Sequence, residues 1–420
     1  MSTIVTKTEP AICVVGLGSI GLPTAILIAN EQIPVLGVDI NKAVVDGVNT
    51  GSLHFVEPGL ESLLRRVVSG KQLRASDKPE IASVYLICVP IPILPDHRPD
   101  LTYLDAAFSS VAPLLRPGAL LIIESSSPVG NTERLRDRLA QLRPDLRMPF
   151  RGGEAADIAI AYCPERAQAG RLLDEIEHND RVIGGVSAQC ARKALAFYER
   201  FVRGRCFTTD TRTAELSDLA EHAYRDVNIA YANELSMICD RFQLDVKELI
   251  LLANLHPRVN ILQPGPGVGG HGIPVAPWFI VHGAQNESRL IRSARNVNLS
   301  KTKWVIEKIR NHIRQRMQRI PGQAARDITL AFLGLSFKPD VNDFRESPAV
   351  EIALEVAHSH PGEVWAVDPY VTQLPAVLEG RVSLKELVYA RTNADIVVLL
   401  VRHAAFLGVS SDSEDFLDFS

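Results

Sequence analysis

The stretch AICVVGLGSIGLPTAILIANEQIPVLGVD, residues 11–39, decides the fold. Ala11–Val15 is an apolar run of strand length, and Gly16–Gly21 supplies a glycine-rich turn. Leu22–Asn30 has the composition of a helix, and Pro34–Asp39 is apolar again. Strand, turn, helix and strand in this order are typical of a βαβ unit, in which the two strands pair in parallel.

The same alternation continues beyond residue 39. Further strands are expected at Val84–Val89, Ala119–Glu124 and Ile158–Tyr162, with helices over Leu104–Leu115 and Asn131–Leu142. A chain that alternates in this way forms a parallel sheet with helices on both faces. We therefore predict a doubly wound α/β domain over residues 1–208.

The middle of the chain follows a helical pattern. From Thr213 to Ala253 apolar residues recur every three or four positions without a proline, which predicts one long helix. A basic helical stretch, Lys301–Arg316, is expected to present a solvated face. We predict a central helical region over residues 209–305.

A second α/β series follows this helical region. Its strands are expected at Ile328–Gly334, Glu363–Val367 and Ile396–Val401, which predicts a second domain over residues 306–420. Ser410–Ser420 is rich in acidic residues and serine and is expected to fray. The predicted fold is thus α/β, with two Rossmann-like doubly wound parallel-sheet domains joined by a long central helix.

Composition excludes several classes of function. The net charge of −4, from 45 basic and 49 acidic residues among 420, gives no broad positive field for nucleic acid. Apolar runs are of strand length, and Met1–Pro10 has no apolar signal core, so we expect a cytoplasmic protein with no membrane partner. The six cysteines form no CxxC pair, so neither a metal site nor a disulfide framework is indicated.

The glycine turn predicts a ligand. It contains Gly16, Gly18, Ser19, Ile20 and Gly21 in the spacing G-x-G-x-x-G, and Asp39 ends the next strand. Gly16 permits the tight turn, Gly18 lets the backbone approach a pyrophosphate, and Gly21 lets the helix pack on its strand. Asp39 would accept hydrogen bonds from a ribose diol and would repel a 2′-phosphate, which favours NAD over NADP. A glycine turn without a ligand is the alternative, but the strand and helix around it favour the cofactor.

Segments along nearly the whole chain resemble one protein family. They include Val56-Glu-Pro-Gly-Leu60, Val89-Pro-Ile-Pro92, Tyr162-Cys-Pro-Glu-Arg166, Thr213-Ala-Glu215, His256–His271, Phe337-Lys-Pro339, Arg345-Glu-Ser-Pro348 and Val367-Asp-Pro369. On these segments the chain resembles the UDP-glucose/GDP-mannose dehydrogenase family, and within it the UDP-N-acetyl-D-mannosamine dehydrogenase branch. The resemblance implies an NAD domain, a central helix that builds a homodimer, and a C-terminal domain that binds a UDP-sugar. Family members oxidise the C6 hydroxyl twice and make a uronic acid.

Several catalytic positions implied by the resemblance are changed. The family's cysteine nucleophile, which captures the aldehyde, corresponds to Gly272. A lysine and an asparagine on the central helix, which stabilise the oxyanion, correspond to Asp218 and His222. A nearby aspartate corresponds to Ala276. The missing side chain at Gly272 is expected to open space beside the reacting carbon.

Two other catalytic positions implied by the resemblance carry milder substitutions, and one is retained. Ser126 stands where the family has threonine and keeps the hydroxyl, and Ile91 replaces a second threonine. Glu165 is retained and is expected either to order water or to anchor the turn at Pro164. The catalytic candidates are therefore Ser126, Glu165, Asp218 and His222.

Asp218 and His222 are four residues apart and share one face of a helix. One hypothesis is that this carboxylate and imidazole act as a general base, taking the proton from a sugar hydroxyl as hydride leaves. The alternative is a pair without a catalytic role.

The resemblance implies binding residues that this chain keeps. For the substrate they are Arg225, Arg258, Asn260, Gly267 and Lys338, and for NAD they are Pro90, Ser126 and Arg345 beside the glycine turn and Asp39. Arginine suits a diphosphate because its planar fork of N–H donors matches the oxygens.

The leading hypothesis is an NAD-dependent oxidoreductase that acts on a UDP-linked sugar, an N-acetylhexosamine, in a single two-electron step. Loss of the nucleophile at Gly272 motivates the single step. The alternative is a catalytically silent paralogue that binds NAD and UDP-sugar and has a regulatory or partner role. A third hypothesis, full oxidation through a hydrated aldehyde, ranks last because the reaction would develop negative charge beside Asp218.

Overall fold

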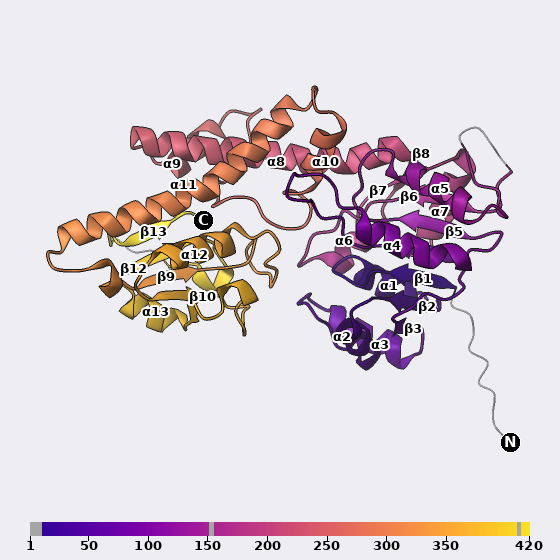
Figure 1. The fold of residues 1–420 in the computed structure, drawn as a ribbon, viewed down its shortest axis with the longest axis horizontal. Helices are drawn as coiled ribbons and strands as arrows, with labels where there is room; N and C mark the ends of the chain where they lie inside the picture. The colour runs from indigo at the N-terminus through magenta and orange to yellow at the C-terminus, as the bar shows by residue number, and fades with distance from the viewer. Residues whose placement is uncertain (1–10, 151–154, 410–412) are drawn as a thin grey trace, which may run out of the picture. The chain divides into compact units, whose positions relative to one another are not determined.

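The structure is a computed structural model that describes residues 11–150, 155–409 and 413–420. The stretch Met1–Pro10, where no apolar signal core is expected from sequence, lies outside the described residues. The chain divides into two compact units. Unit 1 comprises Met1–Glu221 with Trp278–Gly283, and unit 2 comprises His222–Pro277 with Ala284–Ser420. Figure 1 draws most of unit 1 in indigo to magenta and most of unit 2 in pink to yellow.

Unit 1 contains an eight-stranded sheet in the order β3-β2-β1-β4-β5-β6-β7-β8. Its strands are β1 (Ile12–Val15), β2 (Val35–Val38), β3 (Leu73–Ser76), β4 (Val84–Ile87), β5 (Leu120–Ile123), β6 (Ala159–Tyr162), β7 (Arg181–Gly185) and β8 (Cys206–Asp210). All neighbours pair in parallel except β6 and β7, which are antiparallel. The predicted parallel sheet is confirmed, and two further strands extend it in the reverse direction.

The helices of unit 1 are α1 (Gly21–Asn30), α2 (Lys42–Thr50), α3 (Leu60–Ser69), α4 (Thr102–Val111), α5 (Asn131–Leu142), α6 (Leu172–His178) and α7 (Ala188–Tyr198). Helix α1 contacts β1 and β2, while α7 contacts β5, β6 and β7. Every residue of α1 from Gly21 to Ala29 is buried, as expected for a helix that is apolar on all sides. The core of unit 1 therefore surrounds the strand and helix that flank the glycine turn.

Unit 2 contains a five-stranded parallel sheet in the order β11-β10-β9-β12-β13. Its strands are β9 (Leu330–Leu333), β10 (Val364–Val367), β11 (Ser383–Leu384), β12 (Ile396–Leu399) and β13 (Phe416–Asp418). Its helices are α9 (Val246–Ala253), α11 (Arg289–Arg319), α12 (Pro348–Ser359) and α13 (Leu387–Asn393), with most of α8 (Thr211–Phe242) and the start of α10 (Ala276–Gly283). Side chains of α11 and α12 form one hydrophobic core with β9, β10 and β12. The predicted fold class, two Rossmann-like sheets and a long central helix, is confirmed.

The central helix is shorter than predicted. One helix over Thr213–Ala253 was expected, but α8 ends at Phe242. Gln243 adopts a left-handed φ of 57°, and the Leu244 amide donates to the Cys239 carbonyl at 2.9 Å, which closes the helix. The Asp245 carboxylate then accepts from the Lys247 amide at 2.8 Å and starts α9. The prediction was wrong because it relied on the absence of proline, and a left-handed residue followed by an N-cap also ends a helix.

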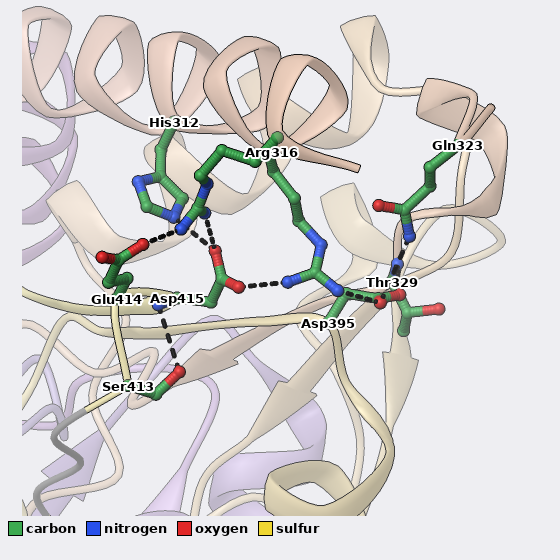
Figure 2. Close-up of polar contacts among 9 residues, drawn as sticks. His312, Arg316, Gln323, Thr329, Asp395, Ser413, Glu414 and Asp415 are labelled. Carbon is green, nitrogen blue, oxygen red and sulfur yellow. Dashed lines mark hydrogen bonds and ion pairs between the residues drawn. The ribbon is translucent and has the colours of Figure 1, made fainter. Parts of the chain in front are cut away.

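The C-terminal segment is ordered, which contradicts the predicted fraying for residues 413–420; residues 410–412 lie outside the described part. Strand β13 pairs in parallel with β12, with Phe416 opposite Val397. Asp415 accepts from His312 Nε2 at 2.8 Å and also pairs with Arg316, which reaches Asp395 at 2.7 Å (Figure 2). Acidic residues of the tail therefore dock on basic residues of α11.

These contacts also correct the expectation of a solvated face over Lys301–Arg316. The Lys301 side chain is buried, donates to Ser236 Oγ at 2.7 Å, and lies over the Trp304 ring. Arg316 is engaged by two carboxylates. Lys301 and Arg316 therefore face protein, and the carboxylates that pair with Arg316 come from segments far away in sequence.

Across the described ranges, no helix combines the length and the apolar character that crossing a membrane requires.

Candidate functional site

The predicted cofactor residues of unit 1 meet at one edge of the sheet. The glycine turn follows β1, Asp39 follows β2, Pro90 lies beyond β4 and Ser126 beyond β5. These strands are neighbours in the order β2-β1-β4-β5, and they are parallel, so their carboxyl ends lie together. The strand order reverses between β1 and β4, and ligands of open α/β sheets bind at such a point.

Close packing explains the glycines of the turn. Gly16 has φ 97°, and a Cβ there would lie 2.6 Å from the Cys88 carbonyl oxygen. A Cβ at Gly21 would overlap the Gly16 carbonyl oxygen, whereas one at Gly18 would meet nothing within 4 Å. Ile20 provides no side-chain cap for α1. The first amides of α1 therefore have no capping side chain in front of them, and the backbone at Gly18 is open to an approaching diphosphate.

Asp39 is held in place by backbone donors. Its Oδ2 accepts from the Leu17 amide at 2.9 Å and its Oδ1 accepts from the Asn41 amide at 2.8 Å. Each carboxylate oxygen has a second lone pair that a ribose hydroxyl can use. The negative charge of Asp39 would repel the 2′-phosphate of NADP, so these residues fit NAD.

The first turns of α8 support the loop that carries Ser126. Glu215 is fully buried, and its carboxylate accepts from the Gly130 amide at 2.6 Å and from the Thr132 amide at 2.8 Å. It thereby caps α5, whose own N-cap residue is a glycine without a side-chain acceptor. Ser126 itself is half-buried between β5 and α5.

Glu165 is tied to its own turn. Its Oε2 lies 2.5 Å from Arg181 Nη2, and both side chains are only 3% exposed. Its Oε1 accepts from the amides of Arg166 and Ala167 at 2.8 and 3.0 Å. These contacts are those of a turn anchor, one of the two predicted roles, and a role in ordering water stays a prediction.

Asp218 pairs with a tyrosine of unit 1. The Tyr162 hydroxyl donates to Asp218 Oδ2 at 2.9 Å, and Asp218 is 1% exposed. Burial, and secondly the Asp218 charge, raise the pKa of the Tyr162 phenol well above its usual range. The phenol is thus the proton donor of this pair.

The predicted substrate loop of unit 2 is closed by one asparagine. Asn254 donates to the Ile261 carbonyl at 3.0 Å and accepts from the Ile261 amide at 2.7 Å. Arg258 and Asn260 lie within the closed loop and are exposed, as is Arg225 on α8. The two hydrogen bonds of Asn254 fix the ends of the loop and leave the side chains of Arg258 and Asn260 exposed.

A buried polar network that the sequence reasoning missed holds the rest of this loop. Asn233 Oδ1 accepts from the Gly265 amide at 2.9 Å, and its amide nitrogen donates to Asn298 at 2.9 Å. Asn298 and Arg295 each donate to Asp226 Oδ1 at 2.8 Å. Burial raises the pKa of Asp226 to about 6, although the Arg295 charge lowers it. Asp226 and Asn233 are seven residues apart and therefore lie on one face of α8, and this spacing was the available signal.

The glycines of the loop pack against unit 2. A Cβ at Gly267 would overlap Thr302 Oγ1, and one at Gly269 would lie 2.7 Å from the Phe337 Cβ. The Gly270 amide donates to the Arg345 carbonyl at 2.9 Å. Because these glycines have no side chains, the loop can pack directly on the segments that carry Lys338 and Arg345.

Two predicted charged residues lie on these segments. Lys338 is half-buried, and Arg345 is exposed and lies 2.5 Å from Asp343. The role of Arg345 towards NAD stays a prediction, because it belongs to unit 2 and the glycine turn to unit 1.

His222 fills the space beside Gly272. A Cβ at Gly272 would overlap His222 Nε2 and would lie 2.6 Å from its Cδ2. The expected open space at Gly272 is therefore absent, because an imidazole from α8 occupies it. The structure thus brings together His222 and Gly272, two positions predicted from sequence, and places Asp218 against Tyr162.

Comparison with known proteins matches three successive segments of the chain to one family. Residues 10–202 match the NAD binding domain, residues 212–300 the central domain and residues 331–416 the UDP binding domain of the UDP-glucose/GDP-mannose dehydrogenase family. The first match confirms the cofactor predicted from the glycine turn.

Relatives and solved structures agree with these matches. The chain is 50% identical over 401 residues to an NDP-N-acetyl-D-galactosaminuronic acid dehydrogenase of Ralstonia nicotianae, covering 96% of this chain and 92% of the relative. It is 49% identical over 402 residues to the UDP-N-acetyl-D-mannosamine dehydrogenase of Escherichia coli K12, covering 96% of each. A solved UDP-D-ManNAc dehydrogenase from Pyrococcus horikoshii has a TM-score of 0.83 at 36% identity, covering 96% of this chain and 93% of that one.

Proposed function

The chain belongs to the UDP-glucose/GDP-mannose dehydrogenase family, and from this premise we propose an NAD-dependent oxidoreductase that converts a UDP-linked N-acetylhexosamine in one two-electron step. The names of the relatives, which act on N-acetylated sugar nucleotides, support the substrate class. Loop residues Arg258 and Asn260, with Lys338, supply donors for a diphosphate and a sugar. In unit 1, Asp39 would hold the adenosine ribose of NAD and the α1 amides its pyrophosphate, and the cofactor, when bound, would supply the hydride acceptor.

The packing at Gly272 carries the single-step part of the proposal. Oxidation of an alcohol to a carbonyl releases one hydride and one proton, whereas oxidation of an aldehyde to an acid first needs a nucleophile on the carbonyl carbon. Gly272 offers no thiol, and a side chain there would overlap the His222 imidazole unless that ring moved. Burial raises the pKa of the Cys163 thiol to about 12 and also raises that of Cys239, which disfavours the nucleophilic thiolate at these two positions.

The test is the stoichiometry of NADH and product. Purified protein is incubated with NAD and a panel of UDP-N-acetylhexosamines, and the absorbance of NADH and the product mass are measured on the same samples. We expect one NADH for each product, and a product lighter by the mass of two hydrogens. A uronate with two NADH would refute the single step and favour oxidation through a hydrated aldehyde.

The second candidate is a silent protein that binds NAD and UDP-sugar. It is favoured by Asp218, whose buried carboxylate lies at the position where the family resemblance implies a cation. Thermal stabilisation by NAD and by UDP-N-acetylhexosamine, with no NADH formed from any sugar in the panel, would support this candidate over the oxidoreductase.

We also propose a homodimer built on α8 and α9. Tyr224, Tyr231 and Ile238 recur every seven residues on α8 and are 71%, 56% and 42% exposed. Leu251 and Leu252 of α9 are exposed too. An apolar stripe of this kind is typical of an interface, and a second copy would bury it. Sedimentation of the protein and of Tyr231→Glu tests this: a dimer that Tyr231→Glu dissociates supports it, and a monomeric wild type refutes it.

Two other predictions stay open. The domain boundaries at 1–208, 209–305 and 306–420 can be tested by limited proteolysis. The cytoplasmic location can be tested by cell fractionation.

A further inference from the structure

We propose that Ser125 positions the nicotinamide half of the NAD site, because its hydroxyl ties the segment after β4 to the segment after β5. Ser125 is a positioning residue, since it acts through the Val89 carbonyl and not through contact with the cofactor. This role goes beyond the proposed oxidation: it concerns how the cofactor is held, and it is independent of which sugar reacts.

The strand order of unit 1 assigns the two halves of the cofactor to different strands. Asp39 follows β2, and the first amides of α1 follow β1, so the adenosine ribose and the pyrophosphate belong to the β2 and β1 side. Beyond the point where the strand order reverses, the next strands are β4 and then β5. A dinucleotide that crosses this point therefore has its nicotinamide half over the carboxyl ends of β4 and β5.

The segment after β4 is held by a side chain where the strand ladder stops. Strand β4 ends at Ile87, whose carbonyl accepts from the Glu124 amide at 2.9 Å. Pro90 follows soon after and has no amide hydrogen with which to continue a ladder. The Ser125 hydroxyl lies 2.6 Å from the Val89 carbonyl oxygen and 3.3 Å from that of Ile87, so it donates to Val89.

The Ser125 side chain is itself fixed in place. It is 8% exposed, and the Ser125 carbonyl accepts at 2.8 Å from the hydroxyl of Ser127, which is fully buried. The same loop ends at Gly130, whose amide donates to the buried Glu215 carboxylate at 2.6 Å. Because both ends of the loop are anchored, the Ser125 hydroxyl has a defined place from which to hold Val89.

The segment that Ser125 holds also packs against the glycine turn. A Cβ at Gly16 would lie 2.6 Å from the Cys88 carbonyl oxygen and 3.1 Å from the Val89 amide nitrogen. The peptide between Cys88 and Val89 therefore lies against the turn, and the next carbonyl is the one bonded to Ser125. Release of that carbonyl should shift the nicotinamide side of the site, whereas Asp39 keeps its own two backbone bonds.

The test compares NAD with ADP, which has the adenosine ribose and the diphosphate but lacks the nicotinamide half. Each is titrated calorimetrically into the full-length protein with saturating UDP present, so that ADP does not bind in the UDP binding domain. Ser125→Ala should raise the Kd for NAD about 10-fold, because the Val89 carbonyl loses its donor, and should change the Kd for ADP less than about 2-fold. Asp39→Ala should raise both Kd values by the same factor, since both ligands carry the adenosine ribose.

Fluorescence of bound NADH reports on the nicotinamide half directly, since the reduced ring is the fluorophore. Emission should change when NADH binds the wild type, and in Ser125→Ala saturated with NADH it should lie closer to that of free NADH. Ser288→Ala is the matched control. Ser288 is 4% exposed and donates to the Ala284 carbonyl at 2.7 Å, but it lies in unit 2, so this variant should keep the wild-type Kd and emission.

Equal increases of the two Kd values in Ser125→Ala would refute the role of Ser125, because they would show a general loss of the site. An unchanged Kd for NAD with unchanged NADH emission would refute it as well. None of these measurements needs turnover. If the protein oxidises no UDP-N-acetylhexosamine but Ser125→Ala weakens NAD selectively, only the proposed oxidation fails. If it oxidises one but Ser125→Ala binds NAD as the wild type does, only the role of Ser125 fails.

Discussion

Replacing Arg295 by methionine should destabilise unit 2 strongly, because the change leaves a buried carboxylate without its counter-ion. Arg295 Nη1 lies 2.8 Å from Asp226 Oδ1, and the two side chains are 2% and 0% exposed. The pair links α8 to α11 and belongs to the network that holds Gly265. Both stability and the position of the substrate loop therefore depend on it.

The size of the effect follows from burial. Removing one partner of a fully buried ion pair costs about 3 to 5 kcal/mol, because the remaining charge stays desolvated. Adding Asp226→Asn to Arg295→Met removes that charge and preserves an acceptor for Asn298. The double variant should therefore be more stable than Arg295→Met alone. Arg310→Met is the matched control on the same helix: its ion pair with Glu307 is partly exposed and is expected to contribute about 1 kcal/mol or less.

The effect should also depend on pH. Burial raises the pKa of Asp226 in the folded protein to about 6 from an ordinary value of 3.8. A raised folded pKa means that the stability contributed by this group is present below the unfolded pKa and is lost as pH rises through about 6. Arg295→Met should accordingly lose more stability at pH 8 than at pH 5, and the double variant should lack this dependence on Asp226.

Urea unfolding followed by tryptophan fluorescence measures these differences, since Trp304 and Trp365 both lie in unit 2. The reasoning would be refuted if the double variant lost as much free energy of unfolding as the two single variants summed. Equal losses for Arg295→Met and Arg310→Met would refute it as well.

Three further outcomes are expected. Asp39→Ala should raise the Kd for NAD about 10- to 100-fold and leave the Kd for NADP nearly unchanged, since a carboxylate that accepts from ribose is lost; titration calorimetry measures both, and equal changes would contradict the assignment. Asp415→Asn should destabilise the protein at pH 7, and progressively less as the pH falls below about 3.8. Burial opposes ionisation, yet His312, Arg319 and Arg316 together lower the pKa of Asp415, so its contribution is present above the unfolded pKa and is lost as the pH falls through the lower folded pKa; urea midpoints across pH test this. Gln243→Gly should stabilise by about 1 kcal/mol because φ 57° suits glycine, and a loss of stability would show that the Gln243 side chain contributes more than its strained backbone costs.

Much of the fold could be predicted from local sequence patterns. The apolar runs at β1, β2, β4, β5 and β6 were located within about two residues of their observed ends, because buried parallel strands are continuous apolar segments. The glycine turn was located for a similar reason: its spacing is set by contacts within one βαβ unit. Strands β3, β7 and β8 were not predicted, and β7 runs antiparallel to β6, which no local pattern encodes.

The candidate site divides in the same way. Asp39 and Gly16 could be predicted because the groups that they contact lie in the same short supersecondary unit. The roles of Asn233 and Asn298 could not be predicted, because the two side chains are 65 residues apart in sequence and bond to each other only in the folded chain. Asn233 also accepts from the Gly265 amide. A buried amide and a surface amide look alike in sequence, because only burial makes an unsatisfied polar group costly.

The sequence by itself determined the two α/β series, the long helix between them, the dinucleotide turn and the absence of a side chain at 272. Only the tertiary structure decided what these features contact: that His222 occupies the space beside Gly272, that Asp218 pairs with Tyr162, and that the acidic tail docks on α11. The physical reason is range. Periodicity and turn geometry are properties of neighbouring residues, whereas a side chain packed into the space left by a glycine 50 positions away exists only after the chain has folded.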